Sequence, residues 1–309
     1  MPYPIEKKFV IAVASSALFD LTESDSVFRT HGEDKYREYQ EKNIDKPFEM
    51  GVAFPFIKRL LSLNDSFEEE QPVEVVLMSK NSPETGVRAF RSIQHYGLNI
   101  SRACFTTGKA NFQYLPAFNA SLFLSANYTD VKDALDNGYA AGRVLNKHYI
   151  EDNENDYELR IAFDFDGVLA SDESEQIYKA SGGNMTEYFK HEQQHADEAL
   201  KLGPIGGLLQ KISFFQKLEK KKQDNDSSYK RILKTSIVTA RNAPAHERVV
   251  ASLKEWGVEV DDAFFLGGID KARILNVMKP HIFFDDQMVH LEHIDNIPAV
   301  HIPFGVANK

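Results

Sequence analysis

Two aspartates, Asp164 and Asp166, follow a short apolar run at 159–163 and precede a glycine, Gly167. At the carboxyl end of a strand in an open parallel sheet, carboxylates face the crevice where ligands bind. Because their spacing is two residues, the two side chains lie on the same side of an extended chain. Such a pair can hold a divalent cation, and one carboxylate can attack phosphorus. Asp-Gly pairs also form ordinary turns, so the motif gains weight only from partners elsewhere.

Three further groups supply such partners. Thr239 ends a second apolar run, and Lys271 opens a helical pattern. Asp285 and Asp286 end a third apolar run. Taken singly, these groups could be a helix N-cap, a surface charge and a capping turn. Their order along the chain, with Thr239 and the Asp285–Asp286 pair at strand ends, instead predicts a phosphoryl-transfer site.

The four groups together resemble the signature of the haloacid-dehalogenase-like (HAD) phosphohydrolase superfamily, and their surroundings resemble the cytosolic 5′-nucleotidase I family. The closer resemblance rests on segments 163–175, 238–241, 265–268 and 280–288, and in the N-terminal half on 11–20, 51–58 and 76–81. It covers the chain from about residue 9 to residue 306. At Phe165 and Gly167 the chain has the generic phosphatase form in place of the family's pair of small residues, which leaves the chemistry intact.

The resemblance implies catalysis through an aspartyl-phosphate. Asp164 would attack the phosphorus, and Asp166 would protonate the leaving oxygen and later take a proton from water. Thr239 would bind the phosphoryl oxygens together with neighbouring backbone N–H groups. Lys271 would neutralise charge on the nucleophile and the transferring group.

The cofactor that the resemblance implies is Mg²⁺. Its ligands would be Asp164, the backbone carbonyl of Asp166, and Asp285, with Asp286 as a further ligand or a supporting group. Ligands that are all oxygen atoms suit Mg²⁺ better than zinc.

Candidates for substrate contact lie near these motifs and elsewhere. Ala240 and Arg241 follow Thr239 and would face the phosphate. Phe189 could stack on a purine, although a role in the core is equally compatible with its position. Ser79 and Asn81, in the N-terminal half, could contact the nucleoside or could be turn residues.

The predicted fold is α/β, with a HAD-like, Rossmann-type parallel sheet and a helical cap insert. Residues 151–309 would form the catalytic half, with the insert at about 172–234 built from helices at 173–180, 185–202 and 206–222. A helical insert at this point resembles a cap that closes over the site. The boundary between the two halves is expected near 146–156.

Residues 1–150 would form a non-catalytic Rossmann-like half, because they read as a degenerate internal repeat. The matching segments are 11–18 with 161–168, 75–83 with 235–244, and 122–127 with 282–287. In this register Ala14 and Ser16 replace the two motif aspartates, and Ser125 and Ala126 replace the later pair. Generic βαβ patterning could also produce two similar halves.

Composition narrows the class of protein. The net charge of −10 and pI near 5.5 disfavour a general nucleic-acid binder. No run of eighteen apolar residues and no signal-peptide pattern occur, so we expect a cytoplasmic protein with no membrane partner. Cys104 is the single cysteine, which excludes an internal disulfide framework. The resemblance also implies a possible homo-oligomer.

The predicted function is hydrolysis of nucleoside 5′-monophosphates, AMP or related ones, to nucleoside and phosphate. The phosphohydrolase part follows from the residues, whereas the nucleotide part follows from the resemblance. Two alternatives stay open at this point. The first is a phosphatase or phosphotransferase that acts on another small phosphate ester, and the second is a non-catalytic nucleotide-binding regulator.

Overall fold

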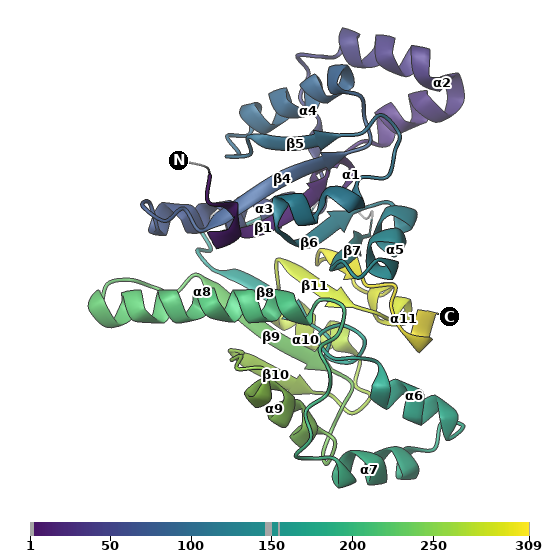
Figure 1. Cartoon of the computed structure of the whole chain (residues 1–309), viewed down its shortest axis with the longest axis vertical. Coiled ribbons are helices and arrows are strands. Elements are labelled where there is room, and N and C mark those ends of the chain that lie inside the picture. Colours follow the sequence, from purple (N-terminus) through teal and green to yellow (C-terminus); the bar gives the residue numbers. More distant parts are fainter. Residues whose placement is uncertain (1–2, 146–149, 154, 309) are drawn as a thin grey trace. The chain divides into compact units, whose positions relative to one another are not determined.

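The computed structural model describes residues 3–145, 150–153 and 155–308 (Figure 1). The chain divides into two compact units, Met1–Asp152 and Asn153–Lys309. Parts of the boundary region predicted at 146–156, namely 146–149 and 154, lie outside the described residues. Each unit contains a parallel sheet with helices, so the α/β class predicted from the sequence is confirmed.

The first unit has a parallel sheet with the strand order β5-β4-β1-β6-β7. Its strands are β1 (Phe9–Ala14), β2 (Phe19–Asp20), β3 (Glu49–Met50), β4 (Val73–Ser79), β5 (Arg102–Phe105), β6 (Ala120–Ser125) and β7 (Ala141–Val144). Its helices are α1 (Ser15–Leu18), α2 (Thr22–Lys42), α3 (Phe54–Ser62), α4 (Pro83–His95) and α5 (Tyr128–Asp136), with 3-10 turns η1 (Ile5–Lys7), η2 (Leu63–Ser66), η3 (Phe112–Tyr114) and η4 (Pro116–Phe118). The short pair β2 and β3 is antiparallel and separate from this sheet.

The core of this unit follows from its apolar strands. Every residue of β1 and of β4 is buried. Such continuous runs are typical of parallel strands that are covered on both faces. The helix that follows β4 begins after Ser82, whose Oγ accepts a hydrogen bond from Thr85 N (3.4 Å), with Pro83 in the first turn.

The second unit has the strand order β10-β9-β8-β11-β12, again all parallel. Its strands are β8 (Leu159–Phe163), β9 (Leu233–Thr239), β10 (Asp262–Phe265), β11 (Ile282–Asp285) and β12 (Ala299–His301). Its helices are α6 (Glu173–Ala180), α7 (Met185–Gln194), α8 (Gly206–Asn225), α9 (His246–Glu255), α10 (Lys271–Met278) and α11 (Met288–Leu291), with the 3-10 turn η5 (Val306–Asn308). In neither unit do the described residues include a helix with the length and apolar character needed to cross a bilayer.

The two units have the same strand order when each is numbered from its own first strand. In both, the first strand lies at the centre, the second and third lie on one side of it, and the fourth and fifth lie on the other. An internal repeat would produce this shared order, and so do generic parallel folds, so the repeat stays a prediction.

The insert between β8 and β9 has two distinct parts. Helices α6 and α7 stand apart from the sheet, whereas α8 runs along it (Figure 1). Glu219 of α8 accepts hydrogen bonds from the backbone N–H groups of Ile232 (2.7 Å) and Leu233 (3.0 Å), which enter β9. The part of the insert that can act as a cap is therefore α6 with α7.

One predicted helix is too long. The segment 185–202 is helical only to Gln194. Beyond it, Leu200 N donates to Ser252 Oγ of α9 (2.9 Å), and Leu202 forms an antiparallel bridge with Ala170. These contacts draw the chain out of the helix and back toward the sheet, and a local helical pattern does not reveal them.

Candidate active site

The Asp-x-Asp motif lies at the end of the central strand of the second unit. β8 ends at Phe163, which is paired with Phe284 of β11, and the two rings stack at 5.2 Å. Asp164 N then donates to the carbonyl of Phe284 (2.8 Å). This continued pairing places Asp164 beside Asp285, because each follows a paired phenylalanine by one residue.

A glycine is required directly after the motif. Gly167 has φ +70°, in the left-handed region that residues with a Cβ rarely adopt. A Cβ built on Gly167 would lie 2.5 Å from Asp286 Oδ2. The turn thus brings its backbone against the carboxylate of Asp286, and only glycine allows this approach.

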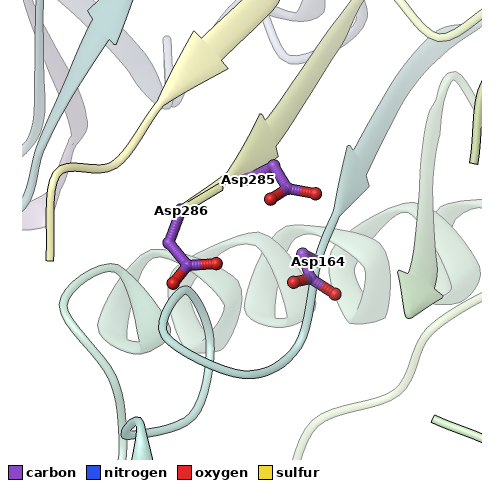
Figure 2. Close-up of side chains that lie close together, drawn as sticks. All are labelled: Asp164, Asp285 and Asp286. Atoms are coloured by element: carbon purple, nitrogen blue, oxygen red, sulfur yellow. The ribbon is translucent and has the colours of Figure 1, made fainter. Parts of the chain in front are cut away.

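Three carboxylates converge at the ends of β8 and β11. Asp164, Asp285 and Asp286 each offer an oxygen within 4.8 Å of the other two (Figure 2). Their exposed fractions are 4%, 0% and 3%. Asp286 Oδ1 is buried and has no hydrogen-bond partner among the described residues. Buried oxygens of this kind fit a hard divalent cation such as Mg²⁺.

Lys271 is the cation that faces this cluster. It is the first residue of α10, which Asp270 caps by accepting a hydrogen bond from Ala272 N (2.9 Å). Lys271 Nζ lies 2.9 Å from Asp164 Oδ1 and 2.7 Å from Asp285 Oδ2. Burial disfavours its charge, but the two carboxylates outweigh burial and raise the pKa of Lys271. The side chain therefore stays charged at neutral pH.

The electrostatics of the cluster favour protons or a cation. Burial and the neighbouring carboxylates raise the pKa of Asp164 to about 6, against the opposing charge of Lys271. Burial and the same kind of repulsion raise the pKa of Asp286 to about 9. Burial would also raise the pKa of Asp285, but Lys271 and His290 hold it below its ordinary value. The single charge of Lys271 does not neutralise the three carboxylates, whereas the addition of a divalent cation would.

His290 is a member of the site that sequence reasoning missed. Its Nδ1 lies 3.2 Å from both carboxylate oxygens of Asp285. Gln287 N also donates to Asp285 Oδ1 (2.8 Å). The only signal in the sequence is a histidine five residues after Asp285, on the short helix α11, and this spacing alone has no specific meaning.

Thr239 and Arg241 lie at the end of β9. Thr239 is buried, and its Oγ1 accepts a hydrogen bond from Arg241 N (3.2 Å). The guanidinium of Arg241 contacts both oxygens of Asp166, at 2.7 Å each. The structure thus joins the ends of β8 and β9 through an ion pair between two residues that the sequence singled out separately.

A cavity of about 390 Å³ opens in front of these residues. Five predicted residues line it, namely Asp164, Asp166, Thr239, Ala240 and Arg241. The wall is completed by residues to which the sequence analysis assigned no role, namely Ser174, Glu175, Tyr178, Met185, Tyr188, Asn242, Gly267, Gly268, Gln287 and His290. The α6–α7 part of the insert thus supplies one side of the cavity, and the ends of the strands supply the other.

The other predicted contact residues lie elsewhere. Phe189 does not line this cavity, whereas its neighbour Tyr188 does, and the two rings pack at 5.4 Å. Ser79 and Asn81 belong to the first unit. There Ser79 Oγ lies 3.2 Å from Ser15 Oγ, and the Asn81 side chain accepts a hydrogen bond from Tyr36 (3.1 Å). Their contact with substrate stays a prediction.

Comparison with known proteins shows which family the chain belongs to. The sequence matches the 5′-nucleotidase family over residues 1–309, and the chain belongs to that family. Human cytosolic 5′-nucleotidase 1B is 35% identical to it over 308 residues, which are 97% of this chain and 49% of the human protein. The chain thus spans about half the length of that curated relative. The family inferred from the motifs is confirmed, and no solved structure matched.

Proposed function

We propose that the chain hydrolyses nucleoside 5′-monophosphates such as AMP to nucleoside and inorganic phosphate, by HAD-type chemistry. Family membership supports the reaction. The single observation that carries the mechanism is the position of Asp164, which opens to the cavity and also adjoins Lys271 and the Asp285–Asp286 pair. The cytosolic location in the name of the human relative supports a cytoplasmic site of action.

The proposed reaction has two steps at Asp164. An Asp164 oxygen forms a bond to phosphorus while the bond to the 5′-oxygen breaks, and Asp166 delivers a proton to that oxygen. Water then attacks the aspartyl-phosphate, and Asp166 accepts the proton that the water loses. Thr239 would hold the phosphoryl oxygens, and Lys271 would offset the charge that accumulates on them.

Mg²⁺ is part of the proposal. Asp164, Asp285 and Asp286 would hold it, together with the backbone carbonyl of Asp166. When bound, the ion would neutralise the clustered carboxylates and the phosphate oxygens. Asp286 Oδ1, which lacks a hydrogen-bond partner among the described residues, would then coordinate the ion.

The first unit is proposed to be non-catalytic. In the register of the internal repeat, Ala14, Ser16, Ser125 and Ala126 stand where the second unit has its four aspartates. Side chains of these types cannot form an aspartyl-phosphate or provide a carboxylate ligand to a metal ion.

The test is phosphate release from a panel of 5′- and 3′-nucleoside monophosphates and sugar phosphates, with Mg²⁺ and with EDTA. Wild type is compared with Asp164→Asn, which keeps the shape of the side chain and removes the nucleophile. We expect release mainly from 5′-monophosphates, dependent on Mg²⁺ and lost in the variant. Release mainly from sugar phosphates would overturn the nucleotide assignment, and no release from any ester would favour a binding protein.

A further inference from the structure

The guanidinium of Arg241 donates all its hydrogen bonds to other groups of the protein. Its Nε and Nη2 donate to the two oxygens of Asp166, both at 2.7 Å. Nη2 also donates to Ser174 Oγ of α6 (2.6 Å). Nη1 donates to the carboxylate of Glu192 of α7 and to the carbonyl of Ala245 (3.1 Å). A guanidinium has five N–H groups, and these five bonds use all of them.

This geometry gives Arg241 a different task from binding phosphate. A phosphoryl oxygen could reach the guanidinium only if one of the five bonds broke. The contacts instead run from Asp166 at the end of β8, through Arg241 at the end of β9, to α6 and α7 of the insert. Arg241 and Glu192 are both almost completely buried. A buried pair of this kind is costly to form, so its presence calls for a specific reason.

The first unit provides an internal comparison, because it repeats the scaffold around this network. In the second unit Arg248 of α9 donates through Nη1 to Glu192 Oε1 (3.2 Å) and through Nε to a backbone carbonyl (3.0 Å). In the first unit Arg88 of α4 donates through Nη1 to Gln40 Oε1 (3.1 Å) and through Nε to a backbone carbonyl (2.8 Å). Arg88 of α4 and Arg248 of α9 thus make the same type of contacts, and these contacts occur also in the unit that lacks the motif aspartates.

A second set of hydrogen bonds supports the same correspondence between α4 and α9. Ser252 Oγ donates to the carbonyl of Arg248 (2.7 Å) and accepts from Leu200 N (2.9 Å). Ser92 Oγ does the same in the first unit, donating to the carbonyl of Arg88 (2.9 Å) and accepting from Phe48 N (2.9 Å). Arg88 and Ser92 of α4 therefore occupy the positions in the first unit that Arg248 and Ser252 of α9 occupy in the second.

The units differ in the charges on this scaffold. Glu192 corresponds to Gln40, because Glu192 accepts a hydrogen bond from Arg248 and Gln40 accepts one from Arg88, the arginine in the corresponding position. Arg241 corresponds to Asn81, because the N–H of each donates to the hydroxyl two residues earlier, at 3.2 Å in both units. The counterpart of Asp166 in the repeat is Ser16. The first unit thus has neutral side chains at the positions of Arg241 and Glu192, and the ion pair occurs in the unit that has the proposed catalytic carboxylate.

We propose that Arg241 is the positioning residue of Asp166, and that Glu192 and Ser174 hold Arg241 in place, so that docking of the insert sets the catalytic carboxylate. The inference rests on the proposed function, in which Asp166 protonates the leaving oxygen. Two parallel N–H bonds fix the plane of the carboxylate. The side chain of Asp166 stays 22% exposed, and each oxygen keeps a second lone pair for the proton that it transfers. Misplacement of a catalytic group by about 1 Å can cost on the order of a hundredfold in rate.

The test uses the double variant Arg241→Asn with Glu192→Gln, which copies Asn81 and Gln40 of the first unit. In this variant Arg248 faces a glutamine at position 192, as Arg88 faces Gln40 in the first unit, so we expect the variant to fold. The rate of the first step, measured as release of the alcohol in a single turnover, is compared on AMP and on 4-nitrophenyl phosphate, because the second step uses Asp166 in the same way for both esters. The alkoxide that leaves AMP needs a proton, whereas nitrophenolate leaves without one.

If Arg241 positions Asp166, the single-turnover rate on AMP falls by on the order of a hundredfold, that on 4-nitrophenyl phosphate falls less than about tenfold, and KM for AMP changes little. Arg241→Lys should recover part of the loss on AMP, since a lysine can still hold one oxygen of Asp166. A rise in KM with unchanged kcat would overturn the proposal and assign Arg241 to phosphate binding. Equal losses on the two esters would also overturn it, as the result of a purely structural role.

Arg248→Gln is the matched control. Arg248 is as buried as Arg241 and contacts the same Glu192, but among the described residues it makes no contact with Asp166. We expect this variant to melt at a lower temperature while the ratio of the two single-turnover rates stays that of wild type. If wild type does not hydrolyse AMP, the proposed function fails, and the same comparison is made with the alkyl phosphate that wild type hydrolyses best.

Discussion

Lys271 Nζ lies 2.7 Å from Asp285 Oδ2, and both side chains are almost completely buried. The same nitrogen lies 2.9 Å from Asp164 Oδ1. A single cation thus joins the proposed nucleophile at the end of β8 to the proposed metal ligand at the end of β11. This relationship makes Lys271 both an electrostatic partner of the reaction and a structural element of the site.

Replacement of Lys271 by methionine should therefore affect activity and stability together. We expect kcat to fall by a hundredfold or more, because the cation that offsets transition-state charge is lost. Two buried carboxylates also lose their partner, which costs roughly 3–5 kcal/mol of unfolding free energy. Phosphate-release kinetics and chemical denaturation measure the two effects. Lys220→Met, on the exposed side of α8, is the control, and a kcat of Lys271→Met within threefold of wild type would refute the role.

Gly167→Ala should weaken the metal site through Asp286. The left-handed backbone at Gly167 costs a residue with a Cβ about 1–2 kcal/mol, and the new Cβ would also displace the Asp286 carboxylate. Titration with Mg²⁺, followed by melting temperature, should show at least a tenfold weaker affinity. Gly257→Ala is a matched control, since Gly257 has φ +68° and nothing within 4 Å of its Cβ position. Equal Mg²⁺ affinity in the two variants would rule out the steric explanation.

Stability of the chelated protein should fall as pH rises. The pKa of Asp286 is about 9 in the folded protein against 3.8 for an ordinary aspartate. Because the folded pKa is the higher one, the stabilisation from this group is complete below about pH 4. It is then lost progressively as the pH rises toward 9. Melting temperatures in EDTA from pH 5 to pH 9 should show this slope, and Asp286→Asn should flatten it.

Mg²⁺ should reverse that trend, because the ion competes with the proton on Asp286. The rise in melting temperature on adding Mg²⁺ should be larger at pH 9 than at pH 6. A metal effect that is the same at both pH values would show that Asp286 is not a ligand.

The aromatic side chain that contacts the base should be Tyr188 rather than Phe189. Stacking on one base contributes about 1–3 kcal/mol, so Tyr188→Ala should raise KM for AMP about tenfold and leave KM for ribose 5-phosphate unchanged. Phe189→Ala, one residue along the same helix, is the comparison. A larger effect of Phe189→Ala on AMP would restore the residue that the sequence suggested.

The motif residues were predictable because parallel strands bring their carboxyl ends to one edge. Asp164, Thr239 and Asp285 each end an apolar run, so the sequence alone placed them together. The wall of the cavity was not predictable in this way. Adjacent residues on a helix point about 100° apart, and the orientation of α7 depends on tertiary contacts. An assignment one position away, Phe189 for Tyr188, faces a different direction.

The role of Arg241 was hidden for a related reason. Its carboxylate partners, Asp166 and Glu192, lie 75 and 49 residues away in the chain. An arginine after a strand-end threonine suggests phosphate binding, and only the fold reveals that its N–H groups are already used. The early end of α7 at Gln194 likewise depends on bonds to α9, which a local pattern cannot express.

The most direct test of the account is to look for the phosphoryl group on Asp164 itself. Protein turning over AMP with Mg²⁺ is quenched in acid, borohydride reduces the aspartyl-phosphate to homoserine with loss of phosphate, and mass spectrometry locates the peptide that carries the homoserine. We predict modification at Asp164 in wild type and none in Asp164→Asn. Turnover with no phosphoryl-enzyme on any time scale of quenching, or modification at another residue, would contradict the mechanism.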